Sequence, residues 1–272
     1  MKINRKKLKK LIIESLKEKE ENKKKKVFSK QEKNNLIKWA IKNDPVKTNN
    51  SMSAFNPDFL PKVENILSYL SKKGPSPALK QLDKKNILPD NFQPEVSTAF
   101  RSLKDQQAKL SSGRSQVAGL GYHVCYTETG EPNSHSADIV DENYQWGAGK
   151  NALQKMAMWE FFMHLGIACE KYGIPDECWG GNWSYPKSRP GGTCEVSYKG
   201  IKYILTRFGF SKKTKFMKTQ ALRIGWDPAH IQAFDDEENT QRIKNTSYVG
   251  LNYLKNKKTG EISKALKGKP KK

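Results

Sequence analysis

The spacing of apolar residues along the chain predicts four helices. Residues 5–21 form the pattern of a basic amphipathic helix, and Ser29 can cap a second helix that runs to about residue 42. Further helices are expected over residues 62–72 and 151–172. The last of these carries a broad apolar face, so it should pack in the core.

From Val96 the chain becomes denser in apolar residues and glycine, as expected for a folded core. Residues 196–205 predict a hairpin that turns at Lys199-Gly200. Gly74-Pro75-Ser76-Pro77 is a cluster of helix breakers and predicts a linker ahead of this core. The expected organisation is a basic amphipathic leader (1–28), a helical extension with its linker (29–90), a core (91–210) and a basic C-terminal region (211–272).

These elements predict an α+β fold in which a small antiparallel sheet packs against one long helix. A helical extension precedes this core. Only 36% of the residues are hydrophobic and the mean hydropathy is −0.81, which is low for a wholly globular chain. We therefore expect basic, disordered tails.

Much of the net charge of +22 sits near the ends of the chain. Residues 1–26 hold twelve Lys or Arg against four Glu, and residues 255–272 hold eight Lys against one Glu. Such runs favour anionic polymers, including nucleic acid and cell-wall polymers, through salt-sensitive attraction. A solvated tail that only keeps the protein soluble is the ordinary alternative. No base-reading module accompanies the charge.

Cysteines and apolar runs limit the class of protein further. The four cysteines form no Cys-x-x-Cys pair, and the chain is too long and too rich in lysine for a disulfide scaffold, so reduced thiols are expected. No apolar run is long enough for a membrane span or for the core of a signal peptide.

Three motifs follow one another between Phe100 and Val196. They are Arg101-Ser102 with Gln106 and Gly113-Arg114 beyond it, then Ser134-His135-Ser136-Ala137-Asp138-Ile139, and finally Trp179-Gly180-Gly181-Asn182-Trp183 ahead of Gly191-Gly192-Thr193-Cys194-Glu195-Val196. Their order and spacing resemble the M15 family of zinc peptidases. Members of that family cut peptidoglycan as D-Ala-D-Ala carboxypeptidases or L-Ala-D-Glu endopeptidases.

The resemblance implies a zinc cofactor and a role for several residues. In the family, a His and an Asp seven residues later bind zinc, and a late His with the base just before it completes the site. Carried over by position, His135 is the first ligand, and Arg101 with Gln106 positions a substrate carboxylate. Trp183 could stack on a sugar or peptide in the substrate groove, or could equally belong to the core. The family's W-G-G-x-W strand corresponds to residues 179–183.

The chain departs from the family where the metal and the base should lie. Asp138 follows His135 by only three residues, and we take it as the second ligand. Thr193 occupies the place of the late His, and Pro190 the place where some members have the base. A neutral hydroxyl is a poor zinc ligand. Glu195 is the carboxylate left to orient a metal-bound water, so the resemblance implies a degenerate zinc site.

Another set of ligands could compensate for these losses. His123, Cys125 and Cys194 would join His135 if the loop over 119–138 folded back, and their nitrogen and thiolate donors suit zinc. The ordinary interpretation, which we favour, is that both cysteines are small buried hydrophobes and that His123 is a strand or turn residue.

The two remaining histidines are not expected to bind metal. His164 lies within the apolar helix and is expected to be a core or rim residue. His230 follows Asp227-Pro228, which is typical of the start of a helix.

The sequence thus supports two hypotheses about function. The first is a phage-type, endolysin-like protein directed at peptidoglycan and built on a zinc peptidase scaffold, weakly active or a pseudoenzyme. The alternative is a non-enzymatic virion or nucleic-acid-associated protein that reuses the fold and contacts DNA or a capsid through its basic ends. Either would reside in a host cytoplasm or a virion, with no signal peptide and no transmembrane segment.

Overall fold

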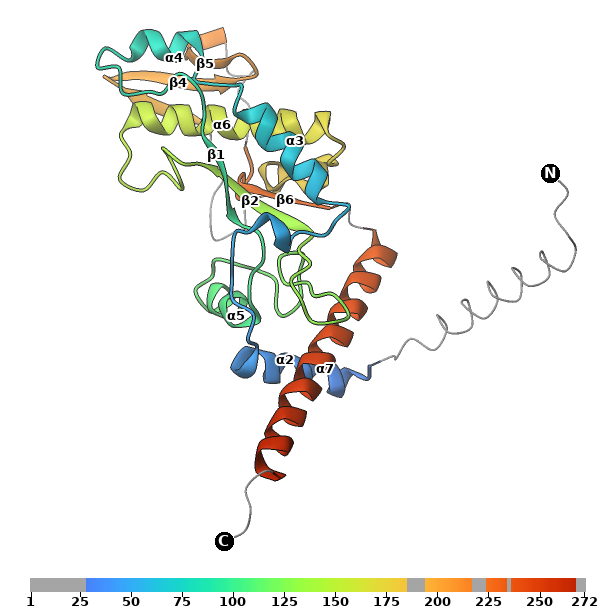
Figure 1. The fold of residues 1–272 in the computed structure, drawn as a ribbon. Helices are drawn as coiled ribbons and strands as arrows, with labels where there is room; N and C mark the ends of the chain where they lie inside the picture. Colours follow the sequence, from blue (N-terminus) through green and yellow to red (C-terminus); the bar gives the residue numbers. More distant parts are fainter. Residues whose placement is uncertain (1–27, 185–193, 217–223, 234–235, 268–272) are drawn as a thin grey trace, which may run out of the picture.

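The computed structural model describes residues 28–184, 194–216, 224–233 and 236–267, with side chains of the last helix described to residue 260. The fold is α+β, as predicted. It contains two three-stranded antiparallel sheets and the helices α2 to α7 (Figure 1). The predicted helix over 5–21 lies outside the described residues.

The first sheet has the order β1-β2-β6 and lies at the centre of the molecule (Figure 1). Its strands are β1 (Pro94–Thr98), β2 (Ser136–Asp141) and β6 (His230–Gln232). Every residue of β2 is buried. Strand β2 is the central strand of this sheet and is covered on both faces, so the side chains that project from it are held in fixed positions.

The second sheet has the order β3-β4-β5 and is the predicted hairpin with one more strand. It comprises β3 (Glu195–Tyr198), β4 (Ile201–Thr206) and β5 (Gly209–Lys212). The turn falls at Lys199 and Gly200, whose φ angles are 49° and 73°. Two consecutive residues with positive φ are typical of the tight turn whose twist suits a hairpin.

Helix α6 (Ala152–Lys171) lies between the two sheets and contacts strands of both (Figure 1). The sequence predicted this helix, and Asn151 begins it with a capping box closed by Gln154. Helix α3 (Leu60–Leu70) packs beside α6, and α4 (Pro77–Leu82) covers the second sheet near β5.

A smaller group of helices lies at the other end of the first sheet. Ser29 caps α2 (Lys30–Asn43) as predicted, with Glu32 closing the capping box. Helix α2 packs against both α5 (Leu103–Ser111) and α7 (Glu237–Lys267). The sequence did not predict α7. The chain continues as a helix to Lys267 through much of the region expected to be a disordered tail.

Two other segments differ from expectation. The predicted linker at Gly74–Pro77 is packed, because Ser76 caps α4 and its backbone N–H and hydroxyl both donate to the buried Glu160 carboxylate. The segment Trp179–Trp183 contains one short 3-10 turn, Gly180–Asn182, instead of a strand, and another turn, Asp176–Cys178, precedes it. Only Trp179 forms a bridge, with Ile231 of β6.

One hydrophobic cluster runs from Phe28 to Leu251 and includes residues of every predicted region that the structure describes. No helix within the described ranges has the length and apolar character needed to cross a bilayer.

Candidate metal centre

The pairing of the first sheet brings two polar side chains together at its buried centre. Asp138 on β2 is the register partner of His230 on β6 and of Thr98 on β1. His123 arrives from the loop that precedes β2, where its carbonyl accepts a hydrogen bond from the backbone N–H of Arg101. All of these side chains are at least nine-tenths buried.

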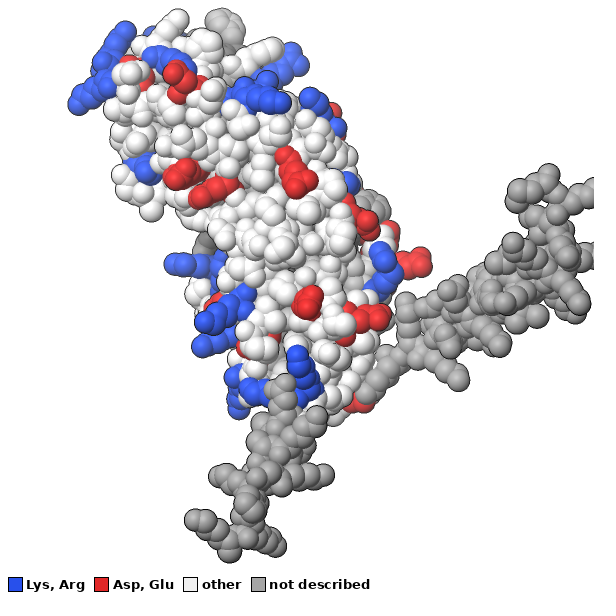
Figure 2. Space-filling view, in the orientation of Figure 1, with Lys and Arg blue, Asp and Glu red and all other residues white. Residues whose placement is uncertain are grey.

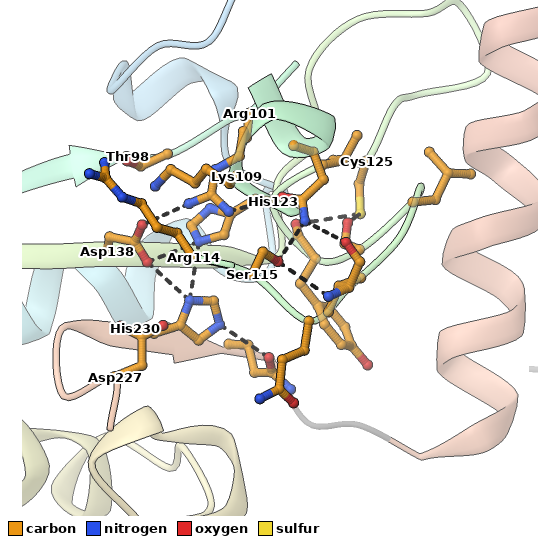
Figure 3. Close-up of a pocket in the computed structure, with 18 of the residues that line it drawn as sticks. Thr98, Arg101, Lys109, Arg114, Ser115, His123, Cys125, Asp138, Asp227 and His230 are labelled. Carbon is orange, nitrogen blue, oxygen red and sulfur yellow. Dashed lines mark hydrogen bonds and ion pairs between the residues drawn. The ribbon is translucent and has the colours of Figure 1, made fainter. Parts of the chain in front are cut away.

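The three side chains converge on one point (Figure 3). Asp138 Oδ1 lies 3.0 Å from His123 Nε2 and 3.0 Å from His230 Nδ1, and the two imidazole nitrogens are 3.1 Å apart. Within the described part of the chain, this is the group of His, Cys, Asp or Glu whose ligand atoms all lie within 4.8 Å of one another. His123, Asp138 and His230 could therefore hold a metal ion.

The outer nitrogen of each imidazole is already engaged. His123 Nδ1 lies 2.8 Å from the carbonyl oxygen of Ala99, and His230 Nε2 lies 3.1 Å from Gln232 Oε1. Both partners are acceptors, so each outer nitrogen carries the proton and each inner nitrogen presents a lone pair. Such outer hydrogen bonds orient histidine ligands in metal sites.

Three acceptor atoms therefore face one another and need a cation or a proton between them. The pKa of Asp138 is held well below its usual range because the contacts with His123 and His230 outweigh the effect of burial. Burial lowers the pKa of His123, whereas the pKa of His230 is raised because Asp138 and Asp227 outweigh its burial. The metal-free centre thus places its proton on His230, in the position that a metal would take.

Arg101 fixes the orientation of the Asp138 carboxylate. Its Nη2 donates to Asp138 Oδ2 over 2.9 Å, which leaves Oδ1 facing the two histidines. Its Nη1 donates to Gln106 Oε1 over 3.0 Å, and Gln106 Nε2 in turn donates to Ser115 Oγ and to the carbonyl of Val117. This buried chain of hydrogen bonds holds one carboxylate oxygen toward the centre.

The centre opens into a cavity of about 980 Å³. Lys109 and Arg114 lie on the α5 side of it, Trp183 and Trp226 on another, and residues from the first turns of α7 line a third. The Trp183 ring lies 5.0 Å from the His230 ring and 6.5 Å from the Trp226 ring, so Trp183 belongs to the cavity wall.

Asp227 lies in the same cavity, three residues before His230. Burial and the charge of Asp138 raise the pKa of its carboxyl, although His230, Arg101 and Lys109 oppose the shift. The carboxylate accepts no hydrogen bond from any residue that the structure describes, and is free to contact a ligand at the metal centre.

The structure separates the sequence-predicted residues into two groups. Asp138, Arg101, Gln106, Trp183, His123 and Cys125 line the cavity, whereas His135, Glu195 and Cys194 do not. His135 Nε2 lies 3.5 Å from the Asn133 amide and outside the metal cluster. His135, which the resemblance made the first ligand, thus lies outside the cluster that could hold a metal, and His123 lies within it.

The other predicted donors are engaged elsewhere. The Cys125 thiol donates to the carbonyls of Gly121 and Tyr122, and Cys194 is buried beside β3. Glu195 forms ion pairs with Lys202 of β4 and with Lys213, which follows β5. It does not line the cavity, so it is not placed to act as a base at this centre. Pro190 and Thr193 lie outside the described residues.

The sequence interpretation missed His230 and Asp227. It assigned His230 to a helix start, and the structure corrects this assignment: His230 begins strand β6. The available signal was the spacing itself, since Asp227-Pro228-Ala229-His230 places a carboxylate three residues ahead of an imidazole. His164 lies on α6, and its Nδ1 is buried without a hydrogen-bond partner among the described residues.

Comparison of the chain with models of protein families, with curated proteins and with solved structures found no match.

Proposed function

We propose that the protein is a zinc-dependent peptidase that hydrolyses amide bonds in peptidoglycan peptides. The observation that carries this proposal is the convergence of three buried acceptor atoms, from His123, Asp138 and His230, in an open cavity that also holds the Asp227 carboxylate. Three protein ligands with one open position distinguish catalytic zinc sites from closed structural ones.

The donor set favours zinc among the common metals. Two imidazoles and one carboxylate are the ligand type of several zinc hydrolases, whereas calcium and magnesium prefer oxygen ligands alone. Each imidazole also has the outer hydrogen bond that a zinc-binding histidine needs. A zinc ion bound here would supply Lewis-acid polarisation of a carbonyl and make water easier to deprotonate.

Asp227 supplies the general base. Its pKa is raised by burial, and a carboxyl with a raised pKa both takes a proton from water and returns it to a leaving amine. No partner among the described residues competes for its oxygens. Trp183 forms the aromatic wall against which a bound peptide packs.

The M15 resemblance supports the choice of peptidoglycan peptides as substrate. The family pattern requires an Asp ligand, a late His and a base just before that His. In this proposal Asp138 is the Asp ligand, and His230 and Asp227 serve as the late His and the base in place of Thr193 and Pro190, which the sequence alignment puts there. The first ligand differs, because His123 lies fifteen residues before Asp138 rather than seven.

The test is hydrolysis of cross-linked peptidoglycan fragments by the zinc-loaded full chain, with Asp227→Asn as the decisive variant. We expect Asp227→Asn to keep one zinc per chain and to lose activity by on the order of 10²–10⁴-fold. Glu195→Gln is the matched control, because Glu195 binds lysines on the second sheet, and should hydrolyse as the parent does.

The absence of hydrolysis would refute the proposal. If the zinc-loaded parent chain releases no peptide fragments, the peptidase proposal is wrong. A non-enzymatic role, with the basic ends on DNA or a capsid, would then be the better account.

A further inference from the structure

Arg101 is committed to the metal centre and has little left for a substrate. Its two terminal nitrogens donate to Asp138 and to Gln106, and its side chain is 9% exposed. Only Nε is buried without a hydrogen-bond partner among the described residues. The arginine expected to hold a substrate carboxylate therefore also positions Asp138.

Two other cations lie on the same side of the cavity. Lys109 belongs to the last turn of α5, and Arg114 follows the turn at Gly113 that ends this helix. Figure 3 shows both side chains with Arg101 and Thr98 on one side of the metal centre. Lys109 is half-buried, whereas Arg114 is exposed at the mouth of the cavity.

Neither of these side chains forms a direct ion pair with a residue that the structure describes. The structure gives no ion pair or side-chain hydrogen bond for Lys109 or Arg114 with any described residue, although Asp138 and Asp227 are in the same cavity. Burial and the nearby charge of Arg101 lower the pKa of Lys109, although the charges of Asp138 and Asp227 oppose the shift. A half-buried ammonium without a direct ion pair is a position that an anion would stabilise.

The charge of the whole cavity also favours an anionic ligand. Its lining includes the cations Arg101, Lys109, Arg114 and Lys244 against the carboxylates Asp138 and Asp227. A divalent metal would add two further positive charges. Figure 2 also shows Lys and Arg side chains gathered over α5 on the face that it draws. The site is therefore suited to an anionic ligand.

We propose that Lys109 and Arg114 form a subsite that binds a carboxylate of the ligand beside the metal centre. A lysine offers a compact charge and an arginine a planar fork that matches a carboxylate. Trp183 and Trp226 also line the cavity and would pack against the uncharged part of the ligand. The inference rests on the proposed function and adds Lys109 and Arg114 to the residues that would position its ligand.

The test compares two small probes, glutarate and acetate, on the zinc-loaded full chain by titration calorimetry. Both offer one carboxylate to the metal, and only glutarate has a second one for the subsite. The parent chain should bind glutarate at least about tenfold more tightly than acetate, as one charge-assisted hydrogen bond allows. In Lys109→Met and in Arg114→Gln this ratio should fall toward one.

Lys104→Met is the matched control, because Lys104 is an exposed lysine on the same helix outside the cavity. It should leave the ratio unchanged. Arg114→Gln alters an exposed side chain, so it remains informative if Lys109→Met does not fold. An unchanged ratio in the folded variants would overturn the subsite. Inorganic phosphate that binds tenfold more tightly than glutarate would overturn its assignment to a carboxylate.

The same experiment separates the subsite from the peptidase proposal. Zinc content reports on the metal centre alone, since neither Lys109 nor Arg114 is a ligand. If the parent chain binds no zinc, the proposed function fails, and the subsite is then decided by acetate alone: its affinity for the zinc-free parent chain should fall in Lys109→Met and in Arg114→Gln but not in Lys104→Met.

Discussion

His230 Nδ1 lies 3.0 Å from Asp138 Oδ1, although the two residues are 92 positions apart in the chain. Their strands pair antiparallel, and Asp138 is the register partner of His230. A one-residue slip of β6 would turn His230 to the other face of the sheet, so the register of this pair determines whether the centre exists.

Metal binding should depend on pH in a definite direction. The pKa of His230 is raised above 6.5 in the metal-free chain, so a metal must displace its proton. As the pH falls through that raised pKa, zinc affinity should weaken by about tenfold per pH unit. Competition with a chromophoric chelator between pH 6 and 8 measures this. An affinity that does not change over that interval contradicts the assignment of the proton.

The hydrogen bonds behind the ligands should support metal affinity. Gln106→Leu removes the acceptor of Arg101 Nη1 and leaves that donor buried without a partner. We expect zinc affinity to fall by on the order of 10–100-fold, with a loss of unfolding free energy of about 1–3 kcal/mol. Gln107→Leu is the control on the neighbouring, exposed position. If both variants had the same zinc affinity, Arg101 would not depend on Gln106 to hold the Asp138 carboxylate in position.

Glu160 should be a stability determinant remote from the metal. It is 1% exposed, and its carboxylate accepts hydrogen bonds from the Ser76 N–H and hydroxyl and from the Phe210 N–H. In Glu160→Gln an amide NH₂ replaces one acceptor and faces a donor, which should lower the unfolding free energy by about 1–3 kcal/mol. Chemical denaturation measures the change. Glu170→Gln, on the exposed face of α6, should be close to neutral.

Acid should destabilise the chain partly through His164. Burial, and the charge of Lys73, lower the pKa of this imidazole from 6.5 to about 4. The unfolded chain therefore binds a proton that the folded chain does not between these two values, and stability declines as the pH falls through that window. His164→Gln should make the decline of the denaturation midpoint shallower. Identical slopes for the parent and the variant would rule out this contribution.

The local signals in the sequence were sufficient for much of the fold. Side chains at Ser29 and Asn151 cap helices where the sequence places them, and the Lys199-Gly200 turn forms as its residue types require. These features depend on neighbours within four residues. Helix α7 escaped prediction because it is stabilised by packing on α2, as in the contact of Lys33 with the Tyr248 ring, rather than by a dense apolar face.

The candidate site was only partly accessible from the sequence. Asp138 was predicted as a ligand and His123 was weighed as one, because both lie near the motif that carries the family resemblance. His135 was assigned as a ligand because it has the position of the first ligand in the family motif, but its side chain faces Asn133. His230 could not be placed without the pairing of β2 with β6, because sequence distance says nothing about which strands become neighbours.

The central claim is that His123, Asp138 and His230 bind one metal ion. Zinc content per chain, measured by elemental analysis of tag-free protein, tests it most directly. We predict about one zinc for the parent chain and for His135→Gln, and almost none for His123→Ala and His230→Ala. Zinc that is lost in His135→Gln but kept in His230→Ala, or a folded parent chain that takes up no zinc, would contradict the account.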